Sequence, residues 1–234
     1  MELAELLEEI EAVCGMDISV GLIDRICIVL GIGQKERQNP FFIEKKGFVI
    51  RAASREAFQE YMGRISDLEK VEELARRLGE ASEYREDISG ILRQIDKMIN
   101  DIRKKALPKF EEGEDNADKL GKYVGKKILE KHIHKISASL FNGMRVKNGR
   151  QAVLEEIING INGYLEQLGV YTVIAQVGEP YRDAEEFYSM VNRLEEPNPN
   201  PVIERVDCPA YVVDYLDEDG EVYHCCADGA CIGK

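Results

Sequence analysis

Residues 150–170 carry the clearest helical pattern in the chain. Apolar side chains recur there at spacings of three and four residues, which places them on one stripe of a helix. They are Val153, Leu154, Ile157, Ile158, Ile161, Tyr164, Leu165 and Leu168. Gly169 follows the stripe and is expected to end the helix, because glycine readily adopts the left-handed conformation found at helix C-termini.

Beyond this helix the chain changes to short runs of β-branched and aromatic residues separated by turn residues. Four such runs predict strands, at residues 171–174, 202–206, 211–215 and 222–226. Asp219-Gly220 lies between the last two runs and is a strong signal for a β-hairpin. Residues 171–234 are therefore predicted to form a small C-terminal antiparallel β domain.

Residues 56–106 are predicted to form one long helix, because the apolar pattern meets no proline before Pro108. In its second half the apolar residues step alternately by four and three, the spacing of a coiled-coil seam. They are Ile88, Leu92, Ile95, Ile99, Ile102 and Ala106. Such a helix, up to about 75 Å long at about 1.5 Å per residue, needs a partner for its apolar face. A second copy of the chain is expected to supply it.

Residues 107–170 are predicted to hold an acidic loop and a two-helix bundle segment. The first helix of the segment covers 117–140, and turns at Asn142-Gly143 and Asn148-Gly149 lead into the helix described above. The fold class expected for the chain is therefore α+β, with a long coiled-coil helix and a short helical bundle followed by the β domain.

Residues 1–55 are predicted to form a small accessory module. Two short helices, at 1–14 and 18–30, precede a β-hairpin at 41–50 that turns at Lys46-Gly47. Protein contacts are the favoured role of this module. The same order of elements also fits a winged-helix-like module, so a role as a nucleic-acid-associated regulator stays open as an alternative.

Charge is unevenly distributed along the chain. The formal net charge is -13, which argues against a general attraction to nucleic acid or to an anionic membrane. Residues 171–234 hold fourteen Asp and Glu against four Lys and Arg, whereas residues 119–150 hold nine Lys and Arg against one Glu. No apolar run reaches the roughly 20 residues that span a bilayer, and the start lacks a basic signal segment. We expect a soluble, cytoplasmic protein.

The residues most able to do chemistry form no convincing catalytic set. His132 and His134 lie about 200° apart on a helix, which is unsuitable for one metal ion. Several cysteines and a histidine gather in the tail and raise a zinc hypothesis; they are Cys208, His224, Cys225, Cys226 and Cys231. Structural strand cysteines are the favoured interpretation, since no C-x-x-C pair is present. We expect no catalytic residue, metal or cofactor, and no enzymatic activity.

Four segments resemble the GrpE family, the nucleotide exchange factors of DnaK-type chaperones. ILRQIDKMINDI (91–102) is similar to the family's long-helix segment, and VLEEIINGINGYLEQLGV (153–170) to the helix that precedes its β domain. GEPYRD (178–183) and ERVDCPAY (204–211) are similar to the link and to a strand of that domain. Glu221 is a departure, because the family has a partner-contacting arginine in this hairpin.

The resemblance implies a homodimer whose β domain opens the ATPase lobe of the chaperone. It implies partner contacts at Pro180, Tyr181, Val206, Pro209, Tyr211, Gly220 and Glu221. It implies dimer contacts at Ile88, Leu92, Ile95, Ile99 and Ile102 in the long helix and at Ile157, Ile161 and Leu165 in the bundle. The expected function is that of a co-chaperone that promotes ADP release. A coiled-coil scaffold or adaptor is the other alternative.

Overall fold

The computed structural model describes residues 41–43, 47–51, 54–80, 85–105, 117–145, 151–192 and 198–234. All of these lie in the unit Pro40–Lys234, which we describe by itself. The two short helices expected at 1–14 and 18–30, and with them the winged-helix-like module, lie outside the described residues. The boundary expected at residue 55 falls inside the unit rather than at its edge.

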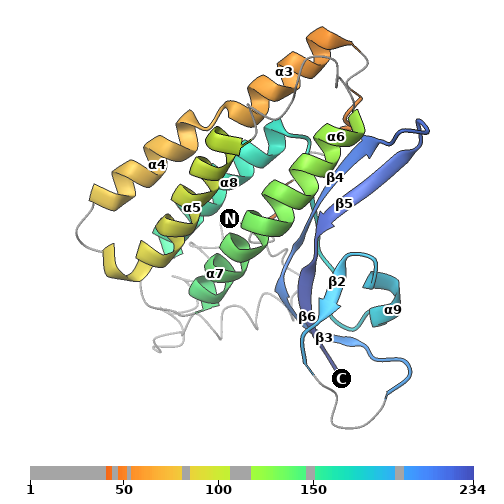
Figure 1. The fold of residues 1–234 in the computed structure, drawn as a ribbon. Helices are drawn as coiled ribbons and strands as arrows, with labels where there is room; N and C mark the ends of the chain where they lie inside the picture. The colour runs from red at the N-terminus through yellow and green to blue at the C-terminus, as the bar shows by residue number, and fades with distance from the viewer. Residues whose placement is uncertain are drawn as a thin grey trace, which may run out of the picture. The chain divides into compact units, whose positions relative to one another are not determined.

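Four helical segments of this single chain close into a bundle (Figure 1). The four are α4 (Glu69–Glu80), α5 (Arg85–Lys105), α8 (Gln151–Gln167) and one continuous helix made of α6 (Ala117–Lys122), the π-helix η2 (Tyr123–Ile133) and α7 (His134–Arg145). A further helix, α3 (Arg55–Ser66), precedes α4. Around the bundle α4 packs on α5, α5 on α7, α7 on α8, and α8 back on α4. The two-helix segment expected to pair with a second copy is thus completed within the chain.

The single long helix expected over 56–106 is wrong, because α3 and α4 are separate helices. The chain leaves the helix at Asp67, whose backbone (φ -78°, ψ 76°) is not helical. Leu68 is nevertheless fully buried, with 0% of its surface exposed. The apolar pattern therefore continues across the break, so periodicity alone did not reveal that the helix ends here. The connection between α4 and α5 lies outside the described residues.

The expectation of an unpartnered coiled-coil seam is also wrong. Five seam residues of α5 are buried in the core of their own chain, and so are the three residues expected to make dimer contacts in α8. The buried set is Ile88, Leu92, Ile95, Ile99, Ile102, Ile157, Ile161 and Leu165. Since α4, η2, α7 and α8 supply the covering side chains, these positions give no basis for a dimer. The homodimer itself stays a prediction.

The α8 helix and its end confirm the sequence interpretation. Gly169 has φ +79°, and its N–H donates to the carbonyl of Glu166 at 3.0 Å. The N–H of Val170 donates to the carbonyl of Leu165 at 3.1 Å. This pair of bonds is the Schellman motif, which satisfies carbonyls that a helix end would otherwise leave unpaired.

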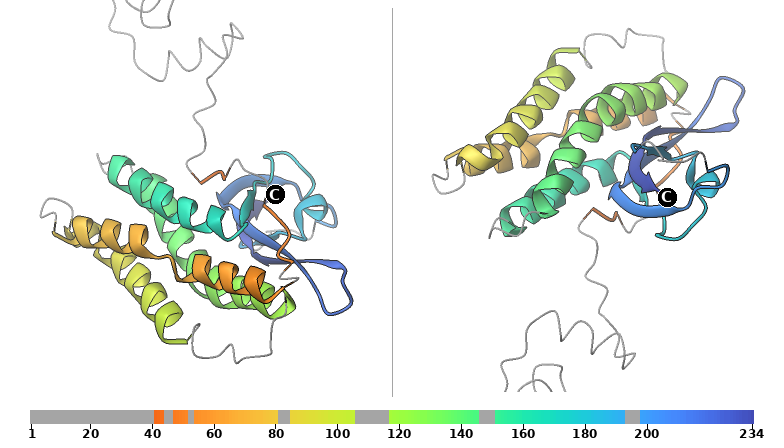
Figure 2. Two further views of the ribbon diagram at one scale, coloured as in Figure 1. Left: turned by 90° about the horizontal axis from the view of Figure 1, so that it is seen from above. Right: turned by 90° about the horizontal axis from the view of Figure 1, so that it is seen from below.

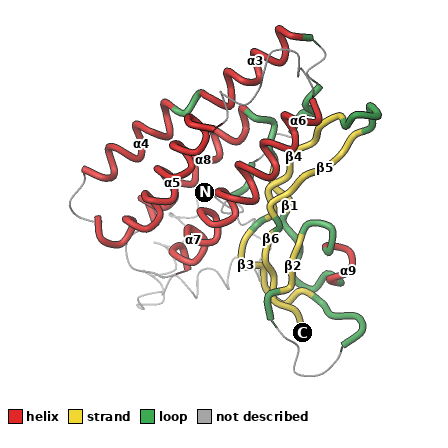
Figure 3. The backbone as a smooth tube through the Cα atoms, in the orientation of Figure 1, coloured by secondary structure: helices red, strands yellow, loops and turns green. Residues whose placement is uncertain are grey.

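Two three-stranded sheets follow α8 (Figure 3). The first has the order β1 (Tyr171–Val173), β4 (Ala210–Leu216), β5 (Val222–Ala227) and is antiparallel. The second has the order β2 (Tyr188–Met190), β6 (Gly229–Gly233), β3 (Ile203–Cys208), and the short helix α9 (Tyr181–Ala184) precedes β2. All four predicted strands are confirmed. The purely antiparallel arrangement is wrong, because β2 runs parallel to β6.

The first sheet lies beside the helices in the two views of Figure 2, and it shares its hydrophobic core with them. Tyr211, Val213 and Tyr215 of β4 project from one face of the strand into the main hydrophobic cluster. The second sheet has a small core of its own around Tyr188 and Ile203. Residues 171–234 are thus two sheets of which one is part of the helical body, rather than one separate β domain.

The β-hairpin expected at 41–50 is not formed by the described residues of that segment. The N–H of Ile43 donates to the hydroxyl of Thr172 at 3.0 Å, and Ile50 forms a parallel bridge with Tyr215 in β4. Phe41 packs against Phe141, with ring centroids 5.4 Å apart. Both arms therefore lie against the helical body and the first sheet, while the expected turn residue Lys46 falls outside the described residues. Among the described helices, none is long and apolar enough to cross a membrane.

Candidate functional site: an acidic hairpin

Strands β4 and β5 and the loop between them, residues 210–227, form what we call the acidic hairpin. It contains five carboxylates and no Lys or Arg; the carboxylates are Asp214, Asp217, Glu218, Asp219 and Glu221. The two strands pair antiparallel along their whole length, from Tyr211 opposite Ala227 to Leu216 opposite Val222. In Figure 1 the loop end of the hairpin extends past α6.

The loop of the acidic hairpin is held by its first carboxylate. Oδ1 of Asp217 accepts the backbone N–H groups of Asp219 at 3.0 Å and Glu221 at 2.9 Å. The N–H of Asp217 in turn donates to the carbonyl of Glu221 at 2.9 Å. Gly220 has φ +81°, a conformation that glycine adopts without strain. The loop is therefore ordered, and Glu218, Asp219 and Glu221 remain exposed to solvent.

Two glycines of the long helix allow the inner face of the hairpin to approach it closely. A Cβ atom added at Gly121 would lie 2.0 Å from Cγ of Tyr215, and one added at Gly125 would lie 2.1 Å from Sγ of Cys225. The Tyr215 ring is 2% exposed, and burial raises the pKa of its hydroxyl to about 12. The hairpin is thus fixed to the helix through β4 and β5 alike.

The outer face of the hairpin carries a hydrogen-bonded cluster of three polar side chains. Nδ1 of His224 lies 2.7 Å from Oδ1 of Asp214, and the Tyr171 hydroxyl donates to the same oxygen at 3.2 Å. A carboxylate oxygen only accepts, so Nδ1 of His224 carries the proton. Burial, with a further contribution from Asp214, raises the pKa of Tyr171 to about 12. The cluster cross-links β1, β4 and β5 on the side opposite the helices.

Two large apolar side chains at the start of β5 are exposed. Val222 has 49% of its surface exposed and Tyr223 has 56%. They point to opposite faces of the strand, and the Tyr223 ring lies 5.5 Å from that of Tyr215. Sequence reasoning missed both, because alternation along a strand predicts that one of two neighbours is buried. Each face of the strand therefore offers one apolar side chain that a partner could cover.

The partner contacts implied by the family resemblance do not form one surface. Gly220 and Glu221 lie in the exposed loop of the acidic hairpin, as expected. Pro180 is exposed and bridges to Val202, while Tyr181 in α9 is half-buried and donates its hydroxyl to the carbonyl of Tyr188 at 2.8 Å. Both lie beside the second sheet.

Three further positions of that set are partly or fully covered. Val206 is half-buried in β3. Pro209 is buried, and Tyr211 is only 2% exposed because its ring points into the helical core. Pro209 and Tyr211 therefore support the fold and do not reach a partner. Glu221 and its loop are the part of the predicted site that remains.

A cleft of about 830 Å³ lies between α7 and the second sheet, and Cys208 and Cys226 of the zinc hypothesis line it. Nδ1 of His134 lies 3.1 Å from the carbonyl of Asp228, and Sγ of Cys226 donates to Oδ1 of Asp228 at 3.2 Å. Burial, followed by the hydrogen bond to Asp228, raises the pKa of Cys226 to about 12, so this thiol stays protonated. Within the described part of the chain, no three His, Cys, Asp or Glu side chains are placed to hold a metal ion.

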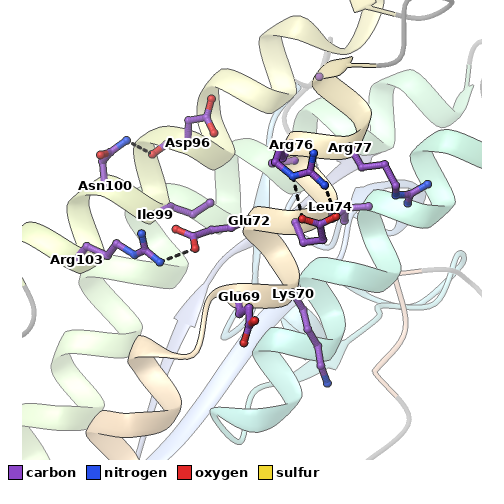
Figure 4. Close-up of a pocket in the computed structure, with 13 residues that line it drawn as sticks. Glu69, Lys70, Glu72, Leu74, Arg76, Arg77, Asp96, Ile99, Asn100 and Arg103 are labelled. Atoms are coloured by element: carbon purple, nitrogen blue, oxygen red, sulfur yellow. Dashed lines mark hydrogen bonds and ion pairs between the residues drawn. The ribbon is translucent and has the colours of Figure 1, made fainter.

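A larger groove of about 1200 Å³ lies between α4 and α5 and is drawn in Figure 4. Its floor is apolar and already buried, and its rim is charged. Arg76 bonds Glu73 at 2.5 Å, and Arg103 bonds Glu72 at 2.5 Å. These ion pairs are solvent-exposed, and within each pair the two charges cancel. The groove therefore has the features of a solvated helix surface rather than of a ligand site.

Comparison with known proteins gives this chain no relative. No family model matches it, and neither the curated proteins nor the solved structures include a significant match. The functional argument therefore rests on the acidic hairpin and on the residues that position it.

Proposed function

We propose that this protein is an adenine-nucleotide exchange factor, a co-chaperone that binds the ATPase domain of a DnaK-type chaperone and promotes ADP release. The single observation that carries the proposal is the acidic hairpin, an ordered loop with exposed carboxylates and apolar side chains on a rigid helical support. The choice of partner comes from the resemblance of residues 153–170, 178–183 and 204–211 to the GrpE family.

Exchange of this kind uses no catalytic residue. A protein that binds the open, nucleotide-free form of an ATPase more tightly than the closed form shifts the population toward the open form, and ADP leaves. The shift equals the difference between the two binding free energies, so the binding element has to hold its shape. The contacts of Gly121 with Tyr215 and of Gly125 with Cys225 give the hairpin that rigidity.

The charge of the hairpin defines the surface that its partner presents. Glu221 occupies the place of a family arginine, and Glu218 and Asp219 stand beside it. We therefore expect a basic patch on the cognate chaperone, the reverse of the charge that an arginine in this place would attract. Such a reversal would make the pair specific, because a chaperone with an acidic patch would repel this hairpin.

The coiled-coil scaffold is the weaker alternative. Its basis was the apolar seam of residues 88–106, and the seam residues of α5 are buried inside the chain. Nucleotide exchange requires one acidic hairpin held on one helical bundle, so the proposal does not depend on a dimer.

Stopped-flow release of a fluorescent ADP analogue from the DnaK-type chaperone of the same organism tests the proposal. We expect the full-length protein to accelerate release by at least about tenfold at low salt and to hydrolyse nothing alone. Glu221→Arg should reduce the acceleration, whereas Glu155→Arg should not, because Glu155 is an exposed residue on α8 in the bundle. No acceleration by the unaltered protein would refute the proposal.

A further inference from the structure

Strand β5 is an edge of the first sheet among the described residues. The strand order is β1, β4, β5, so β5 has a paired strand, β4, on one side only. On the other side β4 pairs with β1 and, further along, with Ile50: the N–H of Ile50 donates to the carbonyl of Asp214 at 2.8 Å, and the N–H of Leu216 donates to the carbonyl of Ile50 at 3.0 Å.

These two bonds fix the direction of the backbone groups in β5. Asp214 and Leu216 point their N–H and C=O groups away from β5. In the register of the two strands, Asp214 lies opposite His224 and Leu216 lies opposite Val222. In an antiparallel ladder, residues of such a pair both point away from each other. The N–H and C=O groups of Val222 and His224 therefore point outward from the sheet, toward a neighbour that the described residues do not supply.

This edge lacks the features that normally prevent pairing. Natural edge strands carry lysine, proline, a bulge or an inward charge. The sequence of β5, VYHCCA, has no proline and no Lys, Arg, Asp or Glu, and its register with β4 runs without a bulge. Near its far end Sγ of Cys226 lies 4.0 Å from the carbonyl of Glu186, so the open stretch is residues 222–225.

We propose that β5 binds an extended, lysine- or arginine-containing segment of a partner protein, which adds to the first sheet as a fourth strand. The backbone groups of Val222 and His224 would bond the added strand, and the exposed side chains of Val222 and Tyr223 would contact alternate residues on its two faces. The exposed carboxylates of the acidic hairpin, Glu218, Asp219 and Glu221, select basic side chains. Lys122, which interacts electrostatically with Glu218 and Asp217, is already paired with Asp118 at 2.6 Å.

The same charge argues against a second copy of this chain as the added strand. Pairing two β5 edges would bring two acidic hairpins together, and the repulsion between their carboxylates would weaken the pairing. A basic segment would instead be attracted to the same carboxylates. The inference goes beyond exchange activity, because strand addition holds whichever partner supplies the segment.

Amide hydrogen exchange of the full-length protein tests the inference directly. The probe is a capped six-residue peptide of alternating lysine and valine, with an alternating glutamate and valine peptide as the control. We expect the lysine peptide to slow exchange at Val222 and His224 by at least tenfold. Tyr223 and Cys225 should not change, because their N–H groups already face β4. Equal protection at all four, no protection, or equal binding of the glutamate peptide overturns the inference.

A pair of variants separates the backbone from the side chain. His224→Pro removes an outward N–H and leaves the β4 ladder intact, and proline is tolerated in edge strands at such positions. It should weaken binding of the lysine peptide at least tenfold, whereas His224→Ala should bind as the unaltered protein does. Circular dichroism checks that His224→Pro is folded; if it is not, Val222→Lys places a repelling charge at the edge and should give the same loss.

Two further measurements keep the outcomes distinct. Concentration-dependent protection of Val222 and His224 without peptide would mean that a second copy occupies β5, and would overturn the inference. The peptide experiments contain no chaperone. They can therefore succeed while ADP release fails, or fail while ADP release succeeds.

Discussion

At Gly125 one added carbon atom would lie 2.1 Å from Sγ and 2.6 Å from Cβ of Cys225. Both distances are far inside van der Waals contact, and the neighbour is a short side chain on a paired strand that has little freedom to move. The position of the acidic hairpin relative to the helix therefore depends on the absence of a side chain here and at Gly121, one helical turn earlier.

Gly125→Ala should destabilise the protein by about 1–3 kcal/mol, because the methyl group overpacks the interface between η2 and β5. Urea unfolding measures the change. Gly163→Ala is the matched control: no atom lies within 4 Å of its added Cβ, so the exposed helical site should gain up to about 1 kcal/mol from the better helix former. Equal effects of the two changes would contradict the close approach.

His132 gives a prediction for pH. The ring is 5% exposed, and Nε2 lies 3.2 Å from Oδ2 of Asp101. Burial lowers the pKa of His132 below its ordinary value of 6.5; Lys131 adds to the shift and Asp101 opposes it. The unfolded chain therefore binds more protons below pH 6.5, and this part of the stability is present above 6.5 and declines as the pH falls.

The difference in unfolding free energy between pH 7.5 and pH 5.5 should accordingly be smaller in His132→Gln than in the unaltered protein. Urea unfolding at about these two pH values measures it, since both lie outside the range in which the Asp and Glu side chains mostly titrate. The exposed His134 supplies the control, His134→Gln. A pH dependence unchanged in His132→Gln would show that the buried imidazole is not its source.

At the scale of the elements, the sequence predicted the faces of the helices better than their number. Leu68 is buried although it lies between two helices, so the apolar stripe of residues 58–78 reads as continuous. Periodicity records which side chains are buried. It does not record whether the buried residues lie on one axis, because a short break can keep the same face inward.

For the strands, the sequence predicted the positions of four but not the exposure of their side chains. Four strands rich in β-branched and aromatic residues were predicted, and the Asp219-Gly220 turn was correct. Strands β2 and β6 were not predicted, because YSM is short and GACIG is bounded by glycines that usually mark turns. Within the candidate site, Glu221 and the loop came from the sequence. The exposure of Tyr223 did not, since alternation along a strand does not tell how far a neighbouring element covers it.

Ile95→Asp tests the corrected role of the α5 seam. Ile95 is 1% exposed in its own chain, so the change places an unpaired charge in the bundle core. We expect a loss of about 3–5 kcal/mol and unfolding at ordinary temperature. Lys97→Asp, at an exposed position two residues on, should change stability by less than about 0.5 kcal/mol. A variant of Ile95 that stays folded and only dissociates from a dimer, by light scattering, would restore the coiled-coil interpretation.

At the scale of the whole molecule, the helices and the first sheet depend on each other. Tyr211, Val213 and Tyr215 belong to the same hydrophobic cluster as the bundle. A chain ending at residue 170 would leave their places in the cluster empty. We therefore expect such a truncation to lose its cooperative thermal transition, measured by circular dichroism; a truncated chain with a sharp transition would show that the bundle folds alone.

The fixation of the hairpin has a mechanical consequence. The acidic hairpin is a cantilever: β4 and β5 are clamped along α6 and η2, and the loop with the first residues of β5 forms the overhang. A push at the loop is carried along two paired strands into one helix, and the deflection of a beam rises steeply with its free length. Each residue pair added between Leu216 and Val222 would lengthen the overhang by about 3.4 Å. A longer hairpin would reach further but would bend where the present one transmits force.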